Sequence, residues 1–587
     1  MRVGSVLWAL GLLAAAGIAA PAAAACKLQQ VAELPVTMEG LSPVVPARIQ
    51  GMDARLVADS GAFFSMLTPA SAKRFGLRTT GLPGSLTING ASGEAHMELT
   101  TAQSFTALGA SFHHVDFLVG APQFEGRIDG LLGQNFLNVT DVEYDFANGV
   151  IRLFKPSGCG GLPLAYWSQG KPFSTMEIQP TAQGSRRIMG SASVNGAHIR
   201  VLFDTGSPFS MLTSRAAALA GVRRDSPEAR AAGVTEGVGP RSLETWIAPF
   251  DSFKIGDEEI KNTRLRLAGI ELDNIDMLIG ADFFLSHRIF VANSQNKLYF
   301  TYNGGPVFRL DRGPSRPADG EQASAASPAG TTDEPKDASG FARRAAASAA
   351  RRDFEHAIAD FGRAAELEPT EPKHLFNRGL ARLSNGQPVL AMGDFDQALK
   401  LKPDYADALL VRGRLRLFAK DPKGAEADFD AALKLDPTYG AYVGSLYVEA
   451  DQFDRAVAMY DAWIAGHPRS PGLAQALNGR CWARALSGRD LDKALADCDQ
   501  ALKIGQKIAS VLDSRGLVHL RLGQLEAAIA DYDAALKLQP KLAWSLYGRG
   551  VAQLKMGSKD AGAADIKAAT ELAPQLPERA KRLGVTA

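Results

Sequence analysis

Two short loops in the sequence place a carboxylate beside a hydroxyl and a glycine. The first reads Asp59-Ser60-Gly61 and the second reads Asp204-Thr205-Gly206, and the two aspartates are 145 positions apart. Each aspartate follows an apolar run that is typical of a strand, and the glycine behind it permits a tight loop. If a fold brought two such carboxylates together, both could not ionise and they would share one proton. A pair of this kind can activate a water molecule by general acid–base catalysis.

The two loops belong to a duplicated unit. Aligned on the aspartates, residues 59–68 and 204–213 share the pattern D-[ST]-G-x-x-F-S-M-L-T. About 75 residues later, each half carries an apolar-apolar-Gly element, Leu131-Leu132-Gly133 or Leu278-Ile279-Gly280. Short apolar runs alternate with turns such as Asn195-Gly196, as they do in β proteins. The sequence therefore predicts one β domain present twice, at residues 30–158 and 163–306.

Paired D-[ST]-G loops with paired apolar-Gly elements resemble the retropepsin-like aspartic proteases, in which two such loops meet at a two-fold axis. The resemblance covers roughly residues 35–305 and implies a single-chain pseudo-dimer of all-β barrels. It implies that Asp59 and Asp204 form a catalytic dyad, one acting as general base on water and the other as general acid on a peptide carbonyl. It implies neither a metal ion nor an organic cofactor. The residues that would support the dyad are Ser60 and Thr205, by hydrogen bonds between the loops, and Gly61 and Gly206, by close approach.

Proteases of this family also close a β-hairpin flap over the substrate to exclude water. Residues 88–93 and 233–239 are the candidate segments, and the flap residues would be Gly90, Ser92, Gly93, Gly237 and Gly239. The two loops differ after the glycine, where Ala62 stands in the first and Ser207 in the second. A hydroxyl beside the carboxylate would lower its pKa. We expect a pH optimum between mildly acidic and neutral.

Three functions remain open at this point. The favoured one is an endopeptidase that cleaves protein or peptide substrates with Asp59 and Asp204. The second is a catalytically inactive relative, a periplasmic adaptor in which both modules bind proteins or peptides. The third is a protease whose competent site forms only between chains, and the presence of both aspartates in one chain argues against it.

The first residues predict export. Met1-Arg2 precedes an apolar run that ends at Ala20, and small residues follow up to Ala25, which is the pattern of a secretory signal peptide over residues 1–25. A membrane anchor is the alternative. No later segment reaches 18 uninterrupted apolar residues, so we expect no transmembrane segment after cleavage. The expected location is the periplasm or the exterior of the cell.

Four cysteines are candidates for two disulfides in an oxidising compartment. Cys159 closes the domain that Cys26 opens, which favours a bond between them. Lipidation of Cys26 is the alternative, but Ala23 stands where lipoproteins usually carry Leu. Cys481 and Cys498 fall at core-facing positions of one predicted helix pair, where either a disulfide or two free thiols fit. The sequence around this second pair lacks the His or Cys of a metal site.

The second half of the chain changes to a helical period. Residues 307–340 are rich in Pro, Ala, Ser and Gly and predict a flexible linker. From 341 to 587 a 34-residue period appears, for example in Phe361, Phe395 and Phe429. It resembles the tetratricopeptide repeat and implies an all-α solenoid of about seven helix pairs that binds a protein partner. The alternative is an array that only scaffolds or dimerises the protein.

Charge and isolated motifs exclude other classes. Lys and Arg number 64 against 63 Asp and Glu, so no basic surface for nucleic acid is expected. His113 and His114 are adjacent on a predicted strand and would point to opposite faces, which is unsuited to a metal site. Asp360-Phe361-Gly362 spells a kinase motif without its companions, and Phe361 already fits a repeat position. The predicted fold is therefore multidomain, a duplicated all-β barrel followed by helical repeats.

Overall fold

The structure is a computed structural model. It describes residues 26–81, 88–90, 93–95, 97–120, 128–179, 187–235, 243–270, 274–308, 334–470, 472–505 and 508–586. The predicted signal peptide and most of the predicted linker lie outside these residues. The chain forms two compact units, Met1–Pro369 and Thr370–Ala587.

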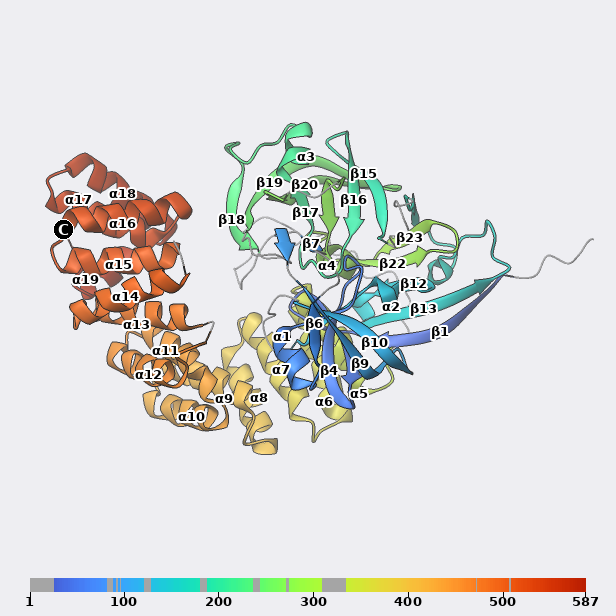
Figure 1. The fold of residues 1–587 in the computed structure, drawn as a ribbon, viewed down its shortest axis with the longest axis horizontal. Helices are drawn as coiled ribbons and strands as arrows, with labels where there is room; N and C mark the ends of the chain where they lie inside the picture. The colour runs from blue at the N-terminus through green and yellow to red at the C-terminus, as the bar shows by residue number, and fades with distance from the viewer. Residues whose placement is uncertain are drawn as a thin grey trace, which may run out of the picture. The chain divides into compact units, whose positions relative to one another are not determined.

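Unit 1 contains two closed β-barrels built on one plan (Figure 1). The first pairs β3 (Ser42–Ile49), β4 (Met52–Ala58), β11 (Gly130–Leu132), β5 (Met66–Leu67), β10 (Ala110–Val119) and β9 (Glu98–Ala107) in this order, and β9 returns to β3. The second pairs β15 (Met189–Val194), β16 (Ala197–Phe203), β21 (Met277–Ile279), β17 (Met211–Thr213), β20 (Glu258–Ala268) and β19 (Leu243–Ile255), and β19 returns to β15. The predicted all-β duplication is confirmed.

In each barrel a hairpin turn at an equivalent place joins the first two strands. Asn195 and Gly196 join β15 to β16 with φ angles of 47° and 78°. Two successive left-handed residues suit the right-handed twist of a tight hairpin, and Asn-Gly adopts them readily. Gln50 and Gly51 make the corresponding turn between β3 and β4 with φ angles of 52° and 77°. The first turn was recognisable in the sequence, whereas Gln50 gave no such signal.

The threonine that ends the shared motif begins a short helix in each half. Thr68 accepts a hydrogen bond from the backbone N–H of Ser71, and Thr213 accepts one from that of Ala216. A hydroxyl at this position satisfies an N–H group that the first turn of a helix leaves unpaired. The helices and the remaining short elements of the barrels are α1 (Pro69–Arg74), α2 (Gln134–Leu137), α3 (Ser214–Leu219), α4 (Ala281–Ser286), η2 (Tyr166–Ser168), β2 (Thr37–Glu39), β6 (Thr79–Gly81) and β18 (Arg230–Thr235).

A six-stranded sheet joins the two barrels. Its order is β1 (Lys27–Pro35), β13 (Val150–Ser157), β12 (Asp141–Asp145), β22 (His287–Ala292), β23 (Lys297–Tyr302) and β14 (Ser174–Glu177). Three strands come from each half, and they repeat in mirrored order from the two edges to the centre. There β12 pairs antiparallel with β22, so that Tyr144 lies opposite Ile289. The pseudo-two-fold axis therefore passes through the middle of this sheet.

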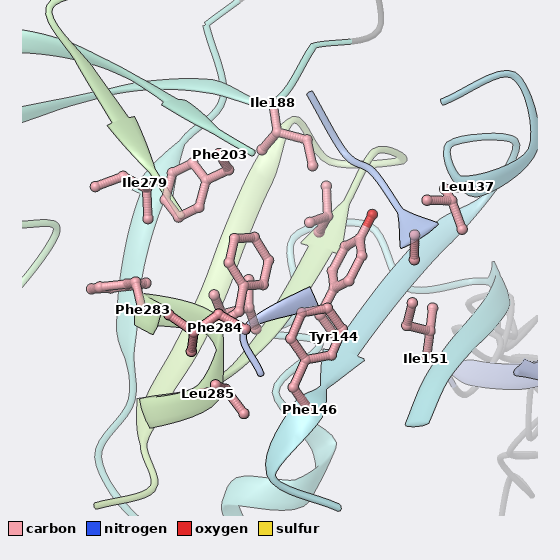
Figure 2. Packing of buried hydrophobic residues seen from close by; sticks show 14 of the residues in the cluster. Leu137, Tyr144, Phe146, Ile151, Ile188, Phe203, Ile279, Phe283, Phe284 and Leu285 are labelled. Atoms are coloured by element: carbon pink, nitrogen blue, oxygen red, sulfur yellow. The ribbon is translucent and has the colours of Figure 1, made fainter. Parts of the chain in front are cut away.

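An aromatic core lies against this sheet and contains side chains of both halves (Figure 2). Phe284 of the second half packs on Tyr144 and on Phe146 of the first, with ring centroids 5.3 Å and 5.7 Å apart. Phe203, at the end of β16, packs on Phe284 with a centroid distance of 6.0 Å. All four rings are buried. Burial of large apolar surface is the main stabilising term for such a junction, so the two barrels share one core.

The first helix pair also belongs to unit 1. Helix α5 (Ala338–Ala350) packs on β2 and on the 3-10 turn η1 (Phe146–Asn148), and α6 (Phe354–Leu367) packs on α5. Ala347 and Ala350 are buried in the same cluster as the barrel residues. Gly149, which follows η1, lies against α5 so closely that a Cβ there would come within 2.6 Å of the Cβ of Arg343. Helices with the repeat period thus begin inside the barrel unit.

Unit 2 is an array of helix pairs, as the 34-residue period predicted. Gly379 lies against the ring of Phe395, and a Cβ there would come within 2.6 Å of it. Gly413 meets Phe429, and Gly516 meets Tyr532, in the same way. The described helices are α7 (Pro372–Ser384), α8 (Pro388–Leu401), α9 (Ala406–Phe418), α10 (Pro422–Leu435), η4 (Pro437–Tyr439), α11 (Gly440–Glu449), α12 (Phe453–Gly466), α13 (Leu473–Ser487), α14 (Leu491–Gly505), α15 (Ala509–Arg521), α16 (Leu525–Leu538), α17 (Ala543–Lys555), α18 (Lys559–Leu572) and α19 (Leu576–Arg582).

Both expected disulfides are present. Cys26 is bonded to Cys159 at the end of the ladder in which Lys27 pairs with Ser157. Cys481 is bonded to Cys498 between α13 and α14. These two cysteines stand at the places that Gly and Phe occupy in neighbouring pairs, so a covalent bond replaces the usual ring contact. Both are fully buried.

A ladder of arginines and aspartates runs through the array. Arg412 of α9 binds Asp428 of α10 through two nitrogens, the shorter distance being 2.6 Å, and binds Asp396 of the preceding pair at 2.8 Å. Bidentate pairing of this kind is among the stronger charged contacts in proteins. Arg480, Arg515 and Arg549 each bind two aspartates in the same way. Arg378, and Arg344 of α5 in unit 1, make only the bidentate pair with the aspartate of the following helix. Asp360 of the apparent kinase motif is the partner of Arg344.

We predict that Asp428→Ala destabilises the array, because Asp428 is buried and also accepts a bond from Arg416 at 2.9 Å. Removing it leaves Arg416 without its nearest carboxylate and Arg412 with Asp396 alone, which costs about 1–3 kcal/mol. Urea denaturation followed by circular dichroism measures this loss. Asp430→Ala, two residues away and exposed, is the matched control and should change stability by less than about 0.5 kcal/mol. Equal effects of both substitutions would contradict a structural role for the ladder.

Candidate active site

The two aspartate loops lie at equivalent ends of strands. Asp59 follows β4 and Asp204 follows β16. The backbone N–H of Asp59 donates to the carbonyl of Leu132 at 2.9 Å, and that of Asp204 donates to the carbonyl of Ile279 at 2.8 Å. Strands β11 and β21, which run parallel to β4 and β16, supply these carbonyls. The apolar-Gly elements seen in the sequence are therefore the strands that position the aspartates.

Ser60 and Thr205 exchange hydrogen bonds across the pseudo-two-fold axis. The backbone N–H of Ser60 donates to Oγ1 of Thr205 at 2.9 Å, and the N–H of Thr205 donates to Oγ of Ser60 at 3.0 Å. Each hydroxyl then donates to a carbonyl of the opposite half, Ser60 to Phe203 at 2.9 Å and Thr205 to Ala58 at 2.7 Å. All four bonds are buried, so every polar atom of the exchange is satisfied.

The glycines of the two loops face the opposite carboxylates. A Cβ at Gly61 would lie 2.4 Å from Cγ of Asp204, and a Cβ at Gly206 would lie 2.3 Å from Cγ of Asp59. No side chain fits in either place. Each carboxylate also receives backbone N–H groups of its own loop. Oδ1 of Asp59 accepts from Gly61 and Ala62, both at 2.8 Å, and Oδ1 of Asp204 accepts from Gly206 and Ser207 at 3.0 Å and 3.2 Å.

Burial raises the pKa of both carboxyl groups above the ordinary value for aspartate. The pKa of Asp204 is raised further, because the negative charge of Asp59 and a hydrogen bond with it add to the effect of burial. At Asp59 the backbone N–H groups, foremost that of Ala62, and a hydrogen bond from Asp204 oppose burial. The two groups titrate as a pair. The environment favours one shared proton, held by Asp204.

Ser207 does not act on the dyad as its sequence position suggested. Its hydroxyl donates to the carbonyl of Phe209 at 2.9 Å, and its backbone N–H, not its hydroxyl, bonds to Asp204. The expected lowering of the pKa by this hydroxyl is therefore wrong for the described geometry. The first loop carries Ala62 at this place and receives an equivalent backbone bond. The two carboxylates thus have similar supports despite the different residues.

A second set of polar residues, which the sequence reasoning missed, supports the loops from behind. Ser65 donates to Oδ1 of Asn135 through both its N–H and its hydroxyl, at 3.0 Å and 2.9 Å. Ser210 binds Asp282 in the same way, at 2.9 Å and 2.7 Å. The hydroxyls also accept the N–H of the glycine that follows β11 or β21, at 3.0 Å and 2.9 Å. The signal was present, since the motif shares its serine and a polar residue stands two places after each glycine.

Two further repeated aspartates have structural positions. Asp129 accepts the backbone N–H of Arg55 at 2.9 Å and the hydroxyl of Ser71 at 2.8 Å, which ties α1 to the middle of β4. Asp276 accepts the N–H of Arg200 at 2.9 Å and pairs with Arg215 of α3. Both carboxylates therefore hold neighbouring elements of the barrels together. This leaves Asp59 and Asp204 as the repeated acids that face one another.

The flap candidates are described only in part. Gly90 ends β7 (Ile88–Gly90) and Gly93 begins β8 (Gly93–Ala95), and these strands form a separate antiparallel hairpin in which the two glycines are paired. Ser92, Gly237 and Gly239 lie outside the described residues. The assignment of the flap remains a prediction. Within the described residues, no group of three or more His, Cys, Asp or Glu side chains is arranged to hold a metal ion.

We predict that Asp204→Asn raises the thermal stability of the protein near neutral pH. The pKa of this carboxyl is raised in the folded state, so unfolding releases a proton above about pH 4, and stability falls as the pH rises towards the folded pKa. An amide of the same shape removes this penalty, which is about 1.4 kcal/mol for each pKa unit. The melting temperature of the variant should exceed that of wild type at pH 7.5, and the gain should vanish near pH 4. Asp251→Asn, at an exposed position, is the control, and a lower melting temperature of Asp204→Asn at pH 7.5 would contradict the prediction.

Several solved structures of helical repeat proteins are similar to the chain. A tetratricopeptide repeat protein from Parabacteroides merdae has 17% identity and a TM-score of 0.37, covering 42% of this chain and 98% of its own. Yeast Tom70 has 19% identity and a TM-score of 0.33, covering 42% of this chain and 54% of its own. PilW, a type IV pilus biogenesis factor, has 18% identity and a TM-score of 0.30, covering 36% and 97%. No curated protein matches the chain.

Family models match both halves of the barrel unit and two parts of the array. Residues 45–136 and 190–283 each match the aspartyl protease family. Residues 390–440 match a tetratricopeptide repeat family, and residues 516–557 match a TPR repeat family. The matched segments of the first family contain both aspartate loops and both apolar-Gly elements. Both barrels of the chain thus match the aspartyl protease family, and two parts of the array match tetratricopeptide repeat families.

Proposed function

We propose that the protein is an aspartic endopeptidase in which Asp59 and Asp204 activate water against a peptide bond. The observation that carries this proposal is the reciprocal approach of each loop glycine to the carboxylate of the other loop. Such an approach leaves the carboxylates adjacent, at an axis where one substrate can contact both. The hydrogen bonds between Ser60 and Thr205 support it, because they keep the two loops in register.

The chemistry follows from the unequal environments of the two carboxyl groups. Asp59, as the carboxylate, takes a proton from a water molecule whose oxygen attacks the peptide carbonyl carbon. Asp204, as the acid, gives its proton to the carbonyl oxygen, and a tetrahedral diol results. When the C–N bond breaks, Asp59 gives its proton to the leaving nitrogen and Asp204 regains one from the diol. The pair then again holds one proton, ready for the next water.

Two phenylalanines beside the first loop favour apolar side chains in the substrate. Phe63 and Phe64 follow the loop directly and are 43% and 46% exposed. Their rings contact one another edge to face, with centroids 4.7 Å apart. Apolar surface exposed next to the loop is suited to contact with apolar side chains. In the second loop the equivalent Phe209 lies under the guanidinium of Arg266 at 4.5 Å, so the two sides of the site differ.

The proposal also includes a role for the helical array and a location for the protein. Tetratricopeptide repeats commonly bind proteins, and we assign the array the role of recruiting a substrate or partner. The two disulfides are compatible with export to the periplasm or the exterior. None of the described helices combines the length and apolar character needed to cross a bilayer.

Proteolysis by the purified mature chain tests the proposed activity. Wild type should cleave an unfolded protein between pH 3 and 8, with a bell-shaped pH profile set by the pair. Asp59→Asn and Asp204→Asn should each reduce the rate by about 10²–10⁴-fold, because each removes one partner of the proton transfer. Fragment sequencing by mass spectrometry should place apolar residues beside the cut bonds.

Folding and contamination are controlled in the same experiment. Asp251→Asn leaves the site intact and should cleave as wild type does, and circular dichroism checks that every variant is folded. Cleavage that persists in both dyad variants would assign it to another protease. If folded wild type is inert over the whole pH range, the proposal fails and the inactive, protein-binding adaptor becomes the better account.

The Cys26–Cys159 bond leads to a separate prediction about the mature N-terminus. A sulfur bonded to Cys159 cannot also carry the thioether of a lipid anchor. We therefore expect the protein exported by a Gram-negative host to have an unlipidated Cys26. Intact-mass spectrometry under non-reducing conditions should give the unmodified mass less four hydrogens for the two disulfides. A mass increased by a diacylglyceryl group, with Cys159 free, would contradict it.

A further inference from the structure

Helix α19, the last described helix, contacts helices of the array that are distant from it in sequence as well as those just before it. Helix α19 packs on α17 and α18, and Leu576, Ala580 and Val585 are buried. These contacts suit a helix that covers the end of a repeat array. The polar contacts of residues 576–586, here called the α19 segment, reach further back. They suggest a second role.

Two arginines of the α19 segment share one carboxylate in a much earlier helix pair. Arg579 donates to Oδ1 of Asp451 at 2.7 Å and 3.2 Å, and Arg582 donates to its Oδ2 at 3.4 Å. Asp451 lies in the turn between α11 and α12, 128 residues before Arg579. Arg579 also donates to the carbonyl of Val448 at 3.3 Å, at the end of α11. Residues three apart lie on one face of a helix, so one face of α19 carries both charges.

The residues after the helix are held by their backbone. Arg521, the last residue of α15, donates to the carbonyl of Leu583 and also to that of Leu486 in α13 at 3.0 Å. Tyr547 of α17 donates to the carbonyl of Val585 at 3.3 Å. Side chains that bind main-chain carbonyls hold a segment without requiring particular side chains from it. The α19 segment is thus in contact with α11, α15 and α17, the first helices of three different pairs.

We propose that this surface of the array is a peptide-binding site and that the α19 segment occupies it as an intramolecular ligand. The external partner would be a basic segment of another protein, with two arginines three residues apart and an apolar residue within the next few positions. Asp451 would receive the arginines, and Arg521 and Tyr547 would bind backbone carbonyls. This proposal rests on the recruiting role proposed above for the array and names the surface that would bind the recruited protein. It is independent of whether the dyad cleaves peptides.

The contacts are of a kind that a competitor can replace. The side chains of Arg579 and Asp451 are 31% and 33% exposed, and partly exposed ion pairs are weak. The segment keeps its place because it is tethered beside the site, which gives it a high effective concentration. An external peptide at sufficient concentration, or one with a larger apolar contact, would displace it.

Hydrogen exchange in the full chain tests whether the arginines hold the segment. In Arg579→Glu/Arg582→Glu, amides of residues 577–586 should exchange at least about tenfold faster, while those of α13, α15 and α17 stay protected. Lys581→Glu is the matched control, because Lys581 is exposed and makes no ion pair within the described residues. Unchanged exchange in the double variant would overturn the proposal.

Peptide binding then tests the site itself. A fluorescent peptide with the sequence of residues 574–586 should bind the double variant at least about tenfold more tightly than wild type, as measured by anisotropy. Adding Asp451→Asn to the double variant, or replacing both arginines of the peptide by Ala, should abolish this gain. If the peptide does not bind the double variant, or binds wild type equally well, α19 is only an end cap and the proposal is wrong. No arm measures proteolysis, so failure here leaves the assignment of the dyad untouched.

Discussion

The barrel unit depends on one close approach, in which a glycine of each loop lies against the carboxylate of the other. A methyl group on either glycine would overlap the opposite carboxyl group, so the loops can approach this closely only with glycine at both positions. The Ser60–Thr205 exchange sets this distance directly. The six-stranded sheet and the shared aromatic core around Tyr144 and Phe284 keep the two barrels from separating. Rigid elements of this kind are what a preorganised site requires.

Buried charged groups have opposite environments in the helical array and at the dyad. In the array the aspartates of the ladder have arginine partners, and the pairing follows the 34-residue repeat, as between Asp428 and Arg412. At the dyad two carboxyl groups are buried together, and backbone N–H groups and the hydrogen bond between the two carboxyl groups favour a single negative charge on the pair. The first arrangement satisfies charge and stabilises the fold. The second shifts the pKa values of both groups, and shifted pKa values are common at functional sites.

The sequence predicted the features that depend on local pattern and on repetition. The duplicated D-[ST]-G loops and the repeat period follow from residue types at fixed spacing, and both disulfides were among the pairings that the sequence left open. The arginine–aspartate pairs could in principle have been recognised, because an aspartate follows each arginine at a nearly constant separation in sequence. Whether the two side chains meet, however, depends on which faces the helices present to each other. The packing of α5 on the barrels could not be inferred, because Ala347 and Ala350 look like ordinary repeat alanines. The contact of Arg579 with Asp451 joins residues far apart in sequence, and nothing in either segment indicates the other.

The supply of both aspartate loops by a single chain has a kinetic consequence. When two chains each contribute one loop, the site exists only as a dimer, and dilution below the dissociation constant abolishes it. Here the loops are joined by a covalent connection and by a continuous sheet through β12 and β22. Their meeting is therefore a first-order folding event, and the fraction of assembled sites is the same at every protein concentration. Independent loops can also diverge, as Ala62 and Ser207 have, without any requirement that one sequence serve both sides of the axis.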